Sequence, residues 1–279
     1  MDDKQIIEYV RSEHLRGVNY EVIVNALVSS GSSKSAINQA FLKAPSVDFL
    51  MKETAKIFNL YKKPLLIISS IPVLFNLVLL GFDKLFLLII NQTTAPLYWT
   101  IIIGLINLFI QLWFGSALIY FVTLQDNKVN LKQIILERLS NLRGFIWVST
   151  SITVSTIIGF VLLIIPGIVF SNWFIFSPYI FFEEKIGGIN SLKQSHYYVK
   201  GYLLAVIWRT IIICISVSAI YLFIGTIITS AGLKILSLPL SIIITILLKP
   251  IPIVFFYILY QRLKETKAIY SILEKTRTI

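Results

Sequence analysis

The residues with the greatest chemical potential in this chain are polar side chains set inside apolar runs. Lys249 is the most prominent, because it precedes Pro250 and Pro252 and lies 13 residues before Arg262, or about 19 Å along a helix. The two prolines remove backbone donors and predict a kink. An ionisable side chain at this depth costs about 3 kcal/mol or more unless it finds a partner. We therefore expect Lys249 either to line a cavity for an anion or to meet a polar neighbour.

Other apolar runs carry polar stripes at helical spacing. Asn107 and Gln111 are four residues apart, and Thr245 lies one turn before Lys249, so each pair shares a helix face. The candidate intramembrane polar site consists of Lys249, Asn107, Gln111, Thr245 and Asn172. The lysine could meet a lipid phosphate, an anionic solute, carbonyls freed by the prolines, or the Asn107–Gln111 stripe. The alternative is that all these groups join neighbouring helices, as polar residues do in membranes.

A second group of candidates lies where an apolar run turns polar, in the segment SLKQSHYYVKG before residue 202. Arg209 is eight residues beyond Gly201, near enough to an interface for its side chain to reach headgroups. The candidate headgroup contacts are Arg209, Ser195, Lys200 and Lys193. A further stripe, Ser151, Ser155 and Gly159, offers small residues at an interval of four on which another helix can lie close.

Enzymatic chemistry finds little support in the sequence. The chain lacks HExxH, Gly-x-Ser-x-Gly and a Cys/His cluster, which would indicate a metal site or an activated nucleophile. Ser195 and His196 are neighbours, but adjacent helical residues do not face each other. With Cys214 as the single cysteine and only His14 besides His196, we expect no enzyme activity, no metal and no cofactor.

The elements that position these residues are apolar helices. Of the 279 residues, 56% are hydrophobic and only 14% are charged, whereas soluble domains carry about 25% charged residues. The net charge of +11 is typical of a membrane protein whose lysines and arginines lie in loops, where they orient the chain and contact anionic headgroups. We therefore expect membrane lipids as partners, and no nucleic acid.

A membrane helix needs about 20 apolar residues, and the sequence offers six candidates. They are 64–82, 97–124, 145–165, 168–182, 202–230 and 235–260. The fourth has only 15 residues and could be re-entrant, but six crossings place most lysines and arginines on one side, as the positive-inside tendency requires. We expect a cell-membrane protein with both termini cytoplasmic and with Pro166–Gly167 as an outer turn.

The fold class expected is all-α, a polytopic bundle of six transmembrane helices with a small cytoplasmic three-helix module. Caps and glycine or proline stops divide residues 1–43 into three short helices. The remaining divisions are an amphipathic interfacial helix or linker at 44–63, the membrane domain at 64–262 and a cytoplasmic tail at 263–279. A second amphipathic helix is expected at 127–143.

Several of these features resemble a known family over roughly residues 50–265. The order Pro-Gly, Ser177-Pro178, an acid at Glu183, then SLKQS, with the ending FYILYQRLK, resembles the membrane domain associated with glycerophosphoryl diester phosphodiesterases and related bacterial proteins. The resemblance implies a six-helix bundle. Asn172 stands where that family often has a basic residue, and the catalytic phosphodiesterase barrel is absent. The pattern of residues 1–43 resembles ubiquitin-associated domains, which implies a cytoplasmic protein partner; the alternative is a simple solubilising cap.

Two functions remain open from the sequence. The first is a non-enzymatic membrane scaffold or lipid-interacting protein that presents its N-terminal module to a partner. The second is a transporter or channel component for a small or anionic solute, which the proline-broken helix and its lysine favour.

Overall fold

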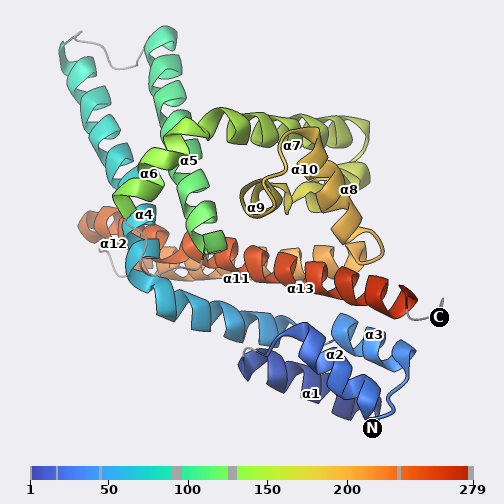
Figure 1. Ribbon diagram of the computed structural model, residues 1–279. Coiled ribbons are helices and arrows are strands. Elements are labelled where there is room, and N and C mark those ends of the chain that lie inside the picture. Colours follow the sequence, from blue (N-terminus) through green and yellow to red (C-terminus); the bar gives the residue numbers. More distant parts are fainter. Residues whose placement is uncertain are drawn as a thin grey trace.

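The computed structural model describes residues 2–16, 18–43, 46–89, 96–124, 131–230 and 234–275. Within these ranges the fold is all-α, as predicted, and it contains no strand. The helices are α1 (Asp3–Arg16), α2 (Tyr20–Ser29), α3 (Lys34–Lys43), α4 (Val47–Ile89), α5 (Leu97–Leu124), α6 (Leu131–Ser140), α7 (Leu142–Leu162), α8 (Ile164–Phe174), α9 (Ser177–Glu183), α10 (Ile189–Val199), α11 (Leu203–Ser230), α12 (Lys234–Leu248) and α13 (Pro250–Lys275). Figure 1 shows their arrangement.

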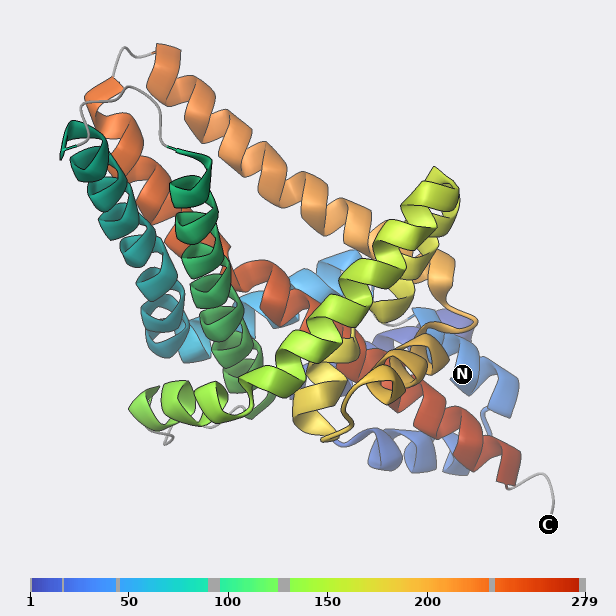
Figure 2. The ribbon, with the colours of Figure 1, turned by 90° about the horizontal axis from the view of Figure 1, so that it is seen from above.

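Six apolar helical segments among the described residues are long enough to cross a membrane. They are Val47–Ile89, Leu97–Leu124, Leu142–Leu162, Ile164–Glu183, Leu203–Ile227 and Pro239–Ile269. The C-terminal ends of α4, α7 and α11 all point toward the top of Figure 2, whereas the two termini lie below. This alternation fits a multi-pass membrane protein with six crossings and both termini on one side.

Helix α4 is bent where its interfacial part meets its apolar part. Tyr61 has non-helical backbone angles (φ −109°, ψ 16°) and lies three residues before Pro64, whose ring clashes with the carbonyl of Leu60. The first part runs beside α13 in Figure 1, and the second turns away beside α5. The predicted interfacial helix at 44–63 is therefore continuous with the first membrane helix, apart from residues 44 and 45, which lie outside the described residues.

The hairpin of α7 and α8 turns three residues earlier than predicted. Leu163 has an extended conformation (φ −170°, ψ 158°) and separates the helices, whereas Pro166 and Gly167 lie in the first turn of α8. The prediction of a Pro-Gly turn was wrong because proline is tolerated in a first helical turn, where no intrahelical donor is required. Gly167 serves packing instead, since a Cβ built on Gly159 would lie 2.9 Å from the Gly167 Cα.

The kink expected near Lys249 is present. Helix α12 ends at Leu248 and α13 begins at Pro250, because neither Pro250 nor Pro252 offers a backbone donor. Helix α13 then continues to Lys275, so the part of the predicted tail from 263 to 275 is helical. Residues 276–279 lie outside the described residues.

Helices α1, α2 and α3 pack around a small apolar cluster. Asn19 Oδ1 accepts a hydrogen bond from the Glu21 amide (3.1 Å) and caps α2, and Ser33 Oγ accepts one from the Ala36 amide at the start of α3 (3.2 Å). The buried members of the cluster are Ile6, Val10, Ile23, Val24, Leu27, Ile37, Ala40, Phe41 and Ile269. Because Ile269 belongs to α13, the core of α1–α3 depends in part on contact with the C-terminal helix.

Helix α6, at Leu131–Ser140, lies within the predicted amphipathic segment at 127–143, but it ends before Leu142 and Arg143, which belong to α7. The guanidinium of Arg138 in α6 lies over the Tyr120 ring, 3.6 Å from the centroid. Burial lowers the pKa of Arg138, and the aromatic face supplies a cation–π contact in return. Residues 127–130 of the predicted helix lie outside the described residues.

The glycine contact in the hairpin gives a first prediction. Gly159→Ala places its methyl group against the Phe170 ring and the Gly167 backbone of α8, and because the backbone cannot move aside, we expect it to destabilise the protein by about 1–3 kcal/mol. Gly104→Ala on α5 meets nothing within 4 Å and serves as the matched control. Thermal unfolding in detergent measures both, and equal midpoints for the two variants would contradict the close packing.

Candidate functional site

A cavity of about 670 Å³ lies between α7, α8 and α10, and we call it the α7–α8–α10 groove. Helix α7 forms one wall with Ser151, Val154 and Ser155, and α8 forms another with Trp173 and Phe174. The Ser151 hydroxyl donates to the Trp147 carbonyl (2.8 Å), so its proton is satisfied within the helix. The walls therefore present mainly apolar surface, in a volume typical of small-ligand sites.

Helix α10 forms the polar edge of the groove. Lys193 and His196 both line the cavity, and the Lys193 side chain is exposed. The His196 ring lies against the Trp173 ring, with centroids 4.5 Å apart. The opposite face of α10, with Ser191, Ser195 and Tyr198, is buried. The groove thus joins an apolar interior to a cationic rim.

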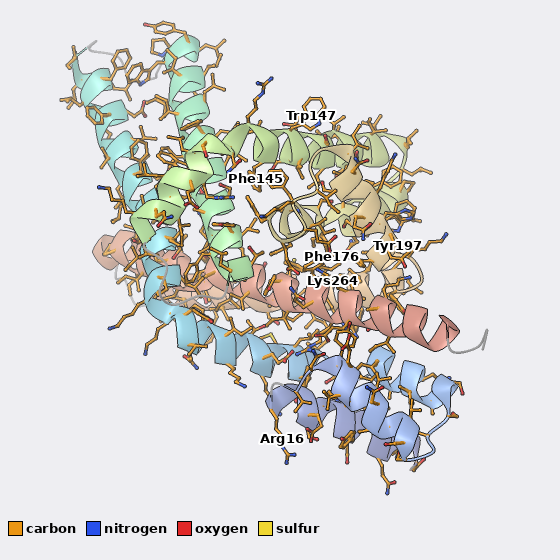
Figure 3. All side chains as sticks on the ribbon, viewed as in Figure 1. Arg16, Phe145, Trp147, Phe176, Tyr197 and Lys264 are labelled. Atoms are coloured by element: carbon orange, nitrogen blue, oxygen red, sulfur yellow. The ribbon has the colours of Figure 1, made fainter. Side chains whose placement is uncertain are left out.

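A second cavity of about 510 Å³ continues this surface along α7 toward the helix N-terminus. Trp147 and Thr150 line both cavities, and Arg143 lines the second. Trp147 is 59% exposed, and Figure 3 shows it on the outer side of α7. An exposed tryptophan between cations is typical of residues at a membrane–water interface.

Serine hydroxyls hold α10 in place. Ser195 is fully buried and donates to the Trp173 carbonyl (2.6 Å), while Ser191 donates to the Gly188 carbonyl (2.7 Å). The expected headgroup contact of Ser195 is therefore wrong, since its hydroxyl is inside the protein. Its actual effect is to fix the distance between the two helices that carry Trp173 and His196.

A half-buried polar network links the C-terminal end of α9 with α10 and α13. Both Tyr198 and Tyr260 donate to Glu184 Oε1, at 2.8 and 2.7 Å, and the Lys264 ammonium lies 3.2 Å from the same oxygen. Burial raises the pKa of Tyr198 above its ordinary value, so the phenol stays protonated and donates at neutral pH. Hydrogen bonds to a charged acceptor are among the strongest in proteins.

Glu183 completes this network. Its Oε1 lies 2.8 Å from Lys264 Nζ, and its Oε2 accepts a hydrogen bond from Gln261 Nε2 (2.6 Å). Figure 3 shows Lys264 on the side of α13 that faces α9, near the fully buried Phe176. The partners are 78 and 81 residues apart in sequence, and sequence reasoning missed them. The sequence signal was the pair of acids next to each other at the end of an apolar run.

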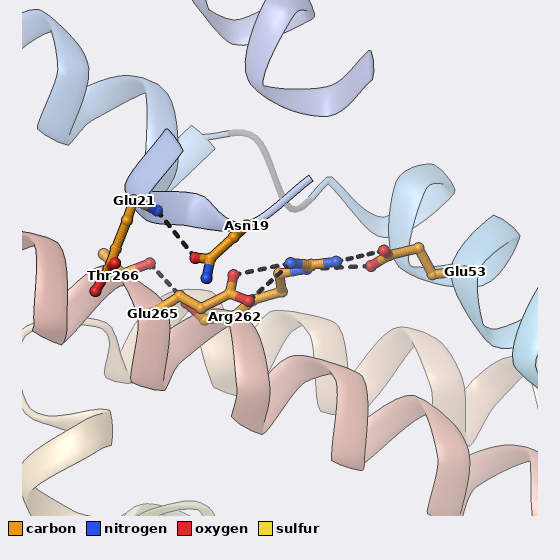
Figure 4. A network of polar contacts seen from close by, with 6 residues as sticks. All are labelled: Asn19, Glu21, Glu53, Arg262, Glu265 and Thr266. Atoms are coloured by element: carbon orange, nitrogen blue, oxygen red, sulfur yellow. Dashed lines mark hydrogen bonds and ion pairs between the residues drawn. The ribbon is translucent and has the colours of Figure 1, made fainter. Parts of the chain in front are cut away.

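A second ionic network ties α13 to the first part of α4. The Arg262 guanidinium donates to both carboxylate oxygens of Glu53 and, through Nη1, to both oxygens of Glu265 (3.1 and 2.8 Å). Figure 4 shows Arg262 between the two acids. All three of its nitrogens are engaged, so Arg262 is neutralised within the protein.

The predicted intramembrane site is brought together only in part. Lys249 Nζ donates to Gln111 Oε1 (2.8 Å) across 138 residues of sequence, which joins the break in α12–α13 to α5. Thr245 donates to the Ser241 carbonyl (2.7 Å) within its own helix, and Asn107 lies half-buried one turn from Gln111. The lysine ammonium therefore has an amide partner from the predicted stripe.

Asn172 lies apart from that pair, in α8. Its side chain is buried and donates to the Ile168 carbonyl (2.8 Å). Among the described residues its Oδ1 has no hydrogen-bond partner. The hydrogen bond to Ile168 lies within α8 and does not reach Lys249.

The remaining interfacial candidates lie at the start of α11. Lys200 is exposed, and its carbonyl accepts a hydrogen bond from Lys267 Nζ (2.9 Å). Arg209 is half-buried and lines a small cavity of about 160 Å³ together with residues of α3 and α13. Lys193, Lys200 and Arg209 are thus on the side of the molecule where the termini lie, but only Lys193 borders the groove.

No family model, curated protein or solved structure matches this chain. The resemblance to the phosphodiesterase-associated membrane domain stays an expectation. Among the described residues no cluster of histidine, cysteine or acidic side chains could hold a metal ion. The arrangement offers one chemical feature, an apolar surface next to cationic side chains.

The Glu184 network gives a second prediction. Tyr198→Phe removes a hydrogen bond to the half-buried Glu184 carboxylate while Tyr260 and Lys264 remain, so we expect a loss of about 1–2 kcal/mol in unfolding free energy. The adjacent Tyr197 is 50% exposed, and Tyr197→Phe is the matched control. Denaturant titration in mixed micelles compares them, and a Tyr198→Phe variant as stable as the control would refute the contribution of this bond.

Proposed function

We propose that the chain is a non-enzymatic integral membrane protein that binds an anionic lipid in the α7–α8–α10 groove. The observation that carries the proposal is an apolar cavity that lies between two potential membrane helices, α7 and α8, and the shorter helix α10, with a cationic rim at Lys193. Lipid tails lose no water on entering such a groove, because they already lie in hydrocarbon. Selectivity therefore comes from packing and from the charge of the headgroup.

The cations near the groove favour a negatively charged headgroup. Lys193 lies on its rim, and Arg143 lines the adjoining cavity on the same helix as Trp147. Exposed lysine and arginine attract anionic lipids by about 1 kcal/mol each. A zwitterionic headgroup would gain less from the same two side chains.

The alternative function, a path for a small or anionic solute, has less support. Its key residue is Lys249, and the hydrogen bond to Gln111 supports a role in joining α5 to the helix break. Interhelical hydrogen bonds of this kind contribute about 1 kcal/mol in membranes.

The same proposal gives α1–α3 the role of an interaction module for a cytoplasmic protein. Support comes from apolar side chains that these helices leave exposed, Val22 at 58% and Val28 at 46%. The core of α1–α3 is completed by Ile269 of α13, so a partner bound to these three helices would be connected mechanically to the membrane helices.

Filling the groove tests lipid binding. Ser155→Trp puts a large side chain into the cavity, and we expect the purified protein to lose most of its co-purifying anionic lipid, as measured by native mass spectrometry. Ile157→Trp, on the same helix, 54% exposed and outside the groove lining, should retain it. Equal lipid retention by the two variants would overturn the proposed site.

Orientation is tested separately. We propose that the protein lies in the cell membrane with both termini cytoplasmic, because Lys193, Lys200 and Lys264 lie on the terminal side. In a Cys214→Ser background, Lys84→Cys near the end of α4 should react with an impermeant maleimide in intact cells. Lys185→Cys should react only after permeabilisation. Labelling of both, or the reverse order, would exclude this topology.

A further inference from the structure

The small cavity beside Arg209, on the terminal side, contains a cation that the protein itself does not neutralise. The cavity measures about 160 Å³ and lies where α3, α11 and α13 meet. Phe41 of α3, Arg209 of α11, and Arg262 and Thr266 of α13 are among its lining residues. Its volume is several times that of a water molecule, about 30 Å³, so it can admit a small polar group.

The two arginines of this cavity are in different electrostatic states. Arg262 is engaged by Glu53 and Glu265 (Figure 4). Arg209 has no hydrogen bond or ion pair to any residue in the part of the chain that the structure describes. Neither Glu53 nor Glu265 is among the described residues that line the cavity. The charge of the Arg209 guanidinium is therefore available to a ligand.

The position of Arg209 adds to this argument. It lies six residues into α11, or about 9 Å from the start of that helix, in a half-buried position. A guanidinium with reduced access to water is costly unless an anion accepts its hydrogen bonds. Its planar fork of donors matches the oxygens of phosphate in a bidentate manner.

We propose that this cavity binds a phosphate group, with Arg209 as its ligating residue. The phosphate is supplied either by the headgroup of an anionic lipid or by inorganic phosphate from the aqueous phase. The site is distinct from the α7–α8–α10 groove and does not depend on it. Because Phe41 lies in the core of α1–α3 as well as in the cavity wall, an occupant contacts both the N-terminal helices and the membrane helices.

Lipid titration of the full-length protein in detergent tests the site. Phosphatidic acid and diacylglycerol with the same acyl chains differ only in the phosphate. We expect phosphatidic acid, but not diacylglycerol, to slow amide hydrogen exchange in residues 34–43 and 203–209. Arg209→Gln should weaken this phosphatidic acid response about tenfold or more, since hydrogen bonds to a charged group are lost. Arg209→Lys keeps the charge but not the bidentate geometry, so its phosphatidic acid response should fall between those of the unmodified protein and Arg209→Gln.

The control and the competing source complete the experiment. Lys193→Gln removes a cation at the groove and should leave protection of residues 34–43 and 203–209 unchanged, which separates this site from the proposed lipid groove. If inorganic phosphate alone gives the same protection, the source is the aqueous phase, and if it does not, the source is the lipid. Protection that survives Arg209→Gln and Arg209→Lys unchanged, or that diacylglycerol produces equally, would overturn the proposal.

Discussion

The half-buried carboxylates of Glu183 and Glu184 hold together the terminal side of the molecule. A carboxylate removed from water is costly unless cations and donors surround it, and here Lys264, Gln261 and two tyrosine hydroxyls do so. Those partners come from α10 and α13, so satisfying the acids fixes both helices against α9. The α7–α8–α10 groove has its shape because α10 is held at this place.

The same requirement explains the distribution of polar groups along the membrane helices. Most serine and threonine hydroxyls donate to a carbonyl three or four residues earlier in their own helix, as Ser151 and Thr245 do. A few polar side chains instead bond across to another helix. The Ser69 hydroxyl donates to the Ile246 carbonyl (3.1 Å), and the Lys249 ammonium donates to Gln111. These few contacts set which helices are neighbours, because apolar surfaces in lipid do not distinguish one partner from another.

The sequence predicted those features of the fold that depend on residues close together in the chain, and missed those that depend on contacts between distant residues. The apolar runs predicted six potential membrane helices, and the bounds of 97–124 agree with α5, because length and hydropathy are local properties. The prolines likewise marked the break after Lys249. The hairpin turn was misplaced because Pro166 is compatible with both a turn and a first helical turn, and only the contact between Gly159 and Gly167 decides between them.

The candidate site depended on long-range contacts and was therefore harder to predict. Lys193 was chosen for its place at an interface, and it borders the groove, but nothing local indicated that Trp173 and Ser155 would lie opposite it. Ser195 was assigned to headgroups because it lies in the polar segment before residue 202, whereas its hydroxyl joins two helices. The Arg262–Glu53 pair is separated by 209 residues, a distance at which one sequence contains no pairing signal.

The position of the break at Lys249 makes α13 a lever. Its 26 residues form a rod of about 39 Å that starts within the apolar bundle and reaches Ile269 in the core of α1–α3. A tilt of about 5° around the break would move Ile269 by about 2.5 Å, since some 19 residues or about 28 Å separate them. Small changes in helix packing at the depth of Gln111 would thus produce larger displacements at the N-terminal helices.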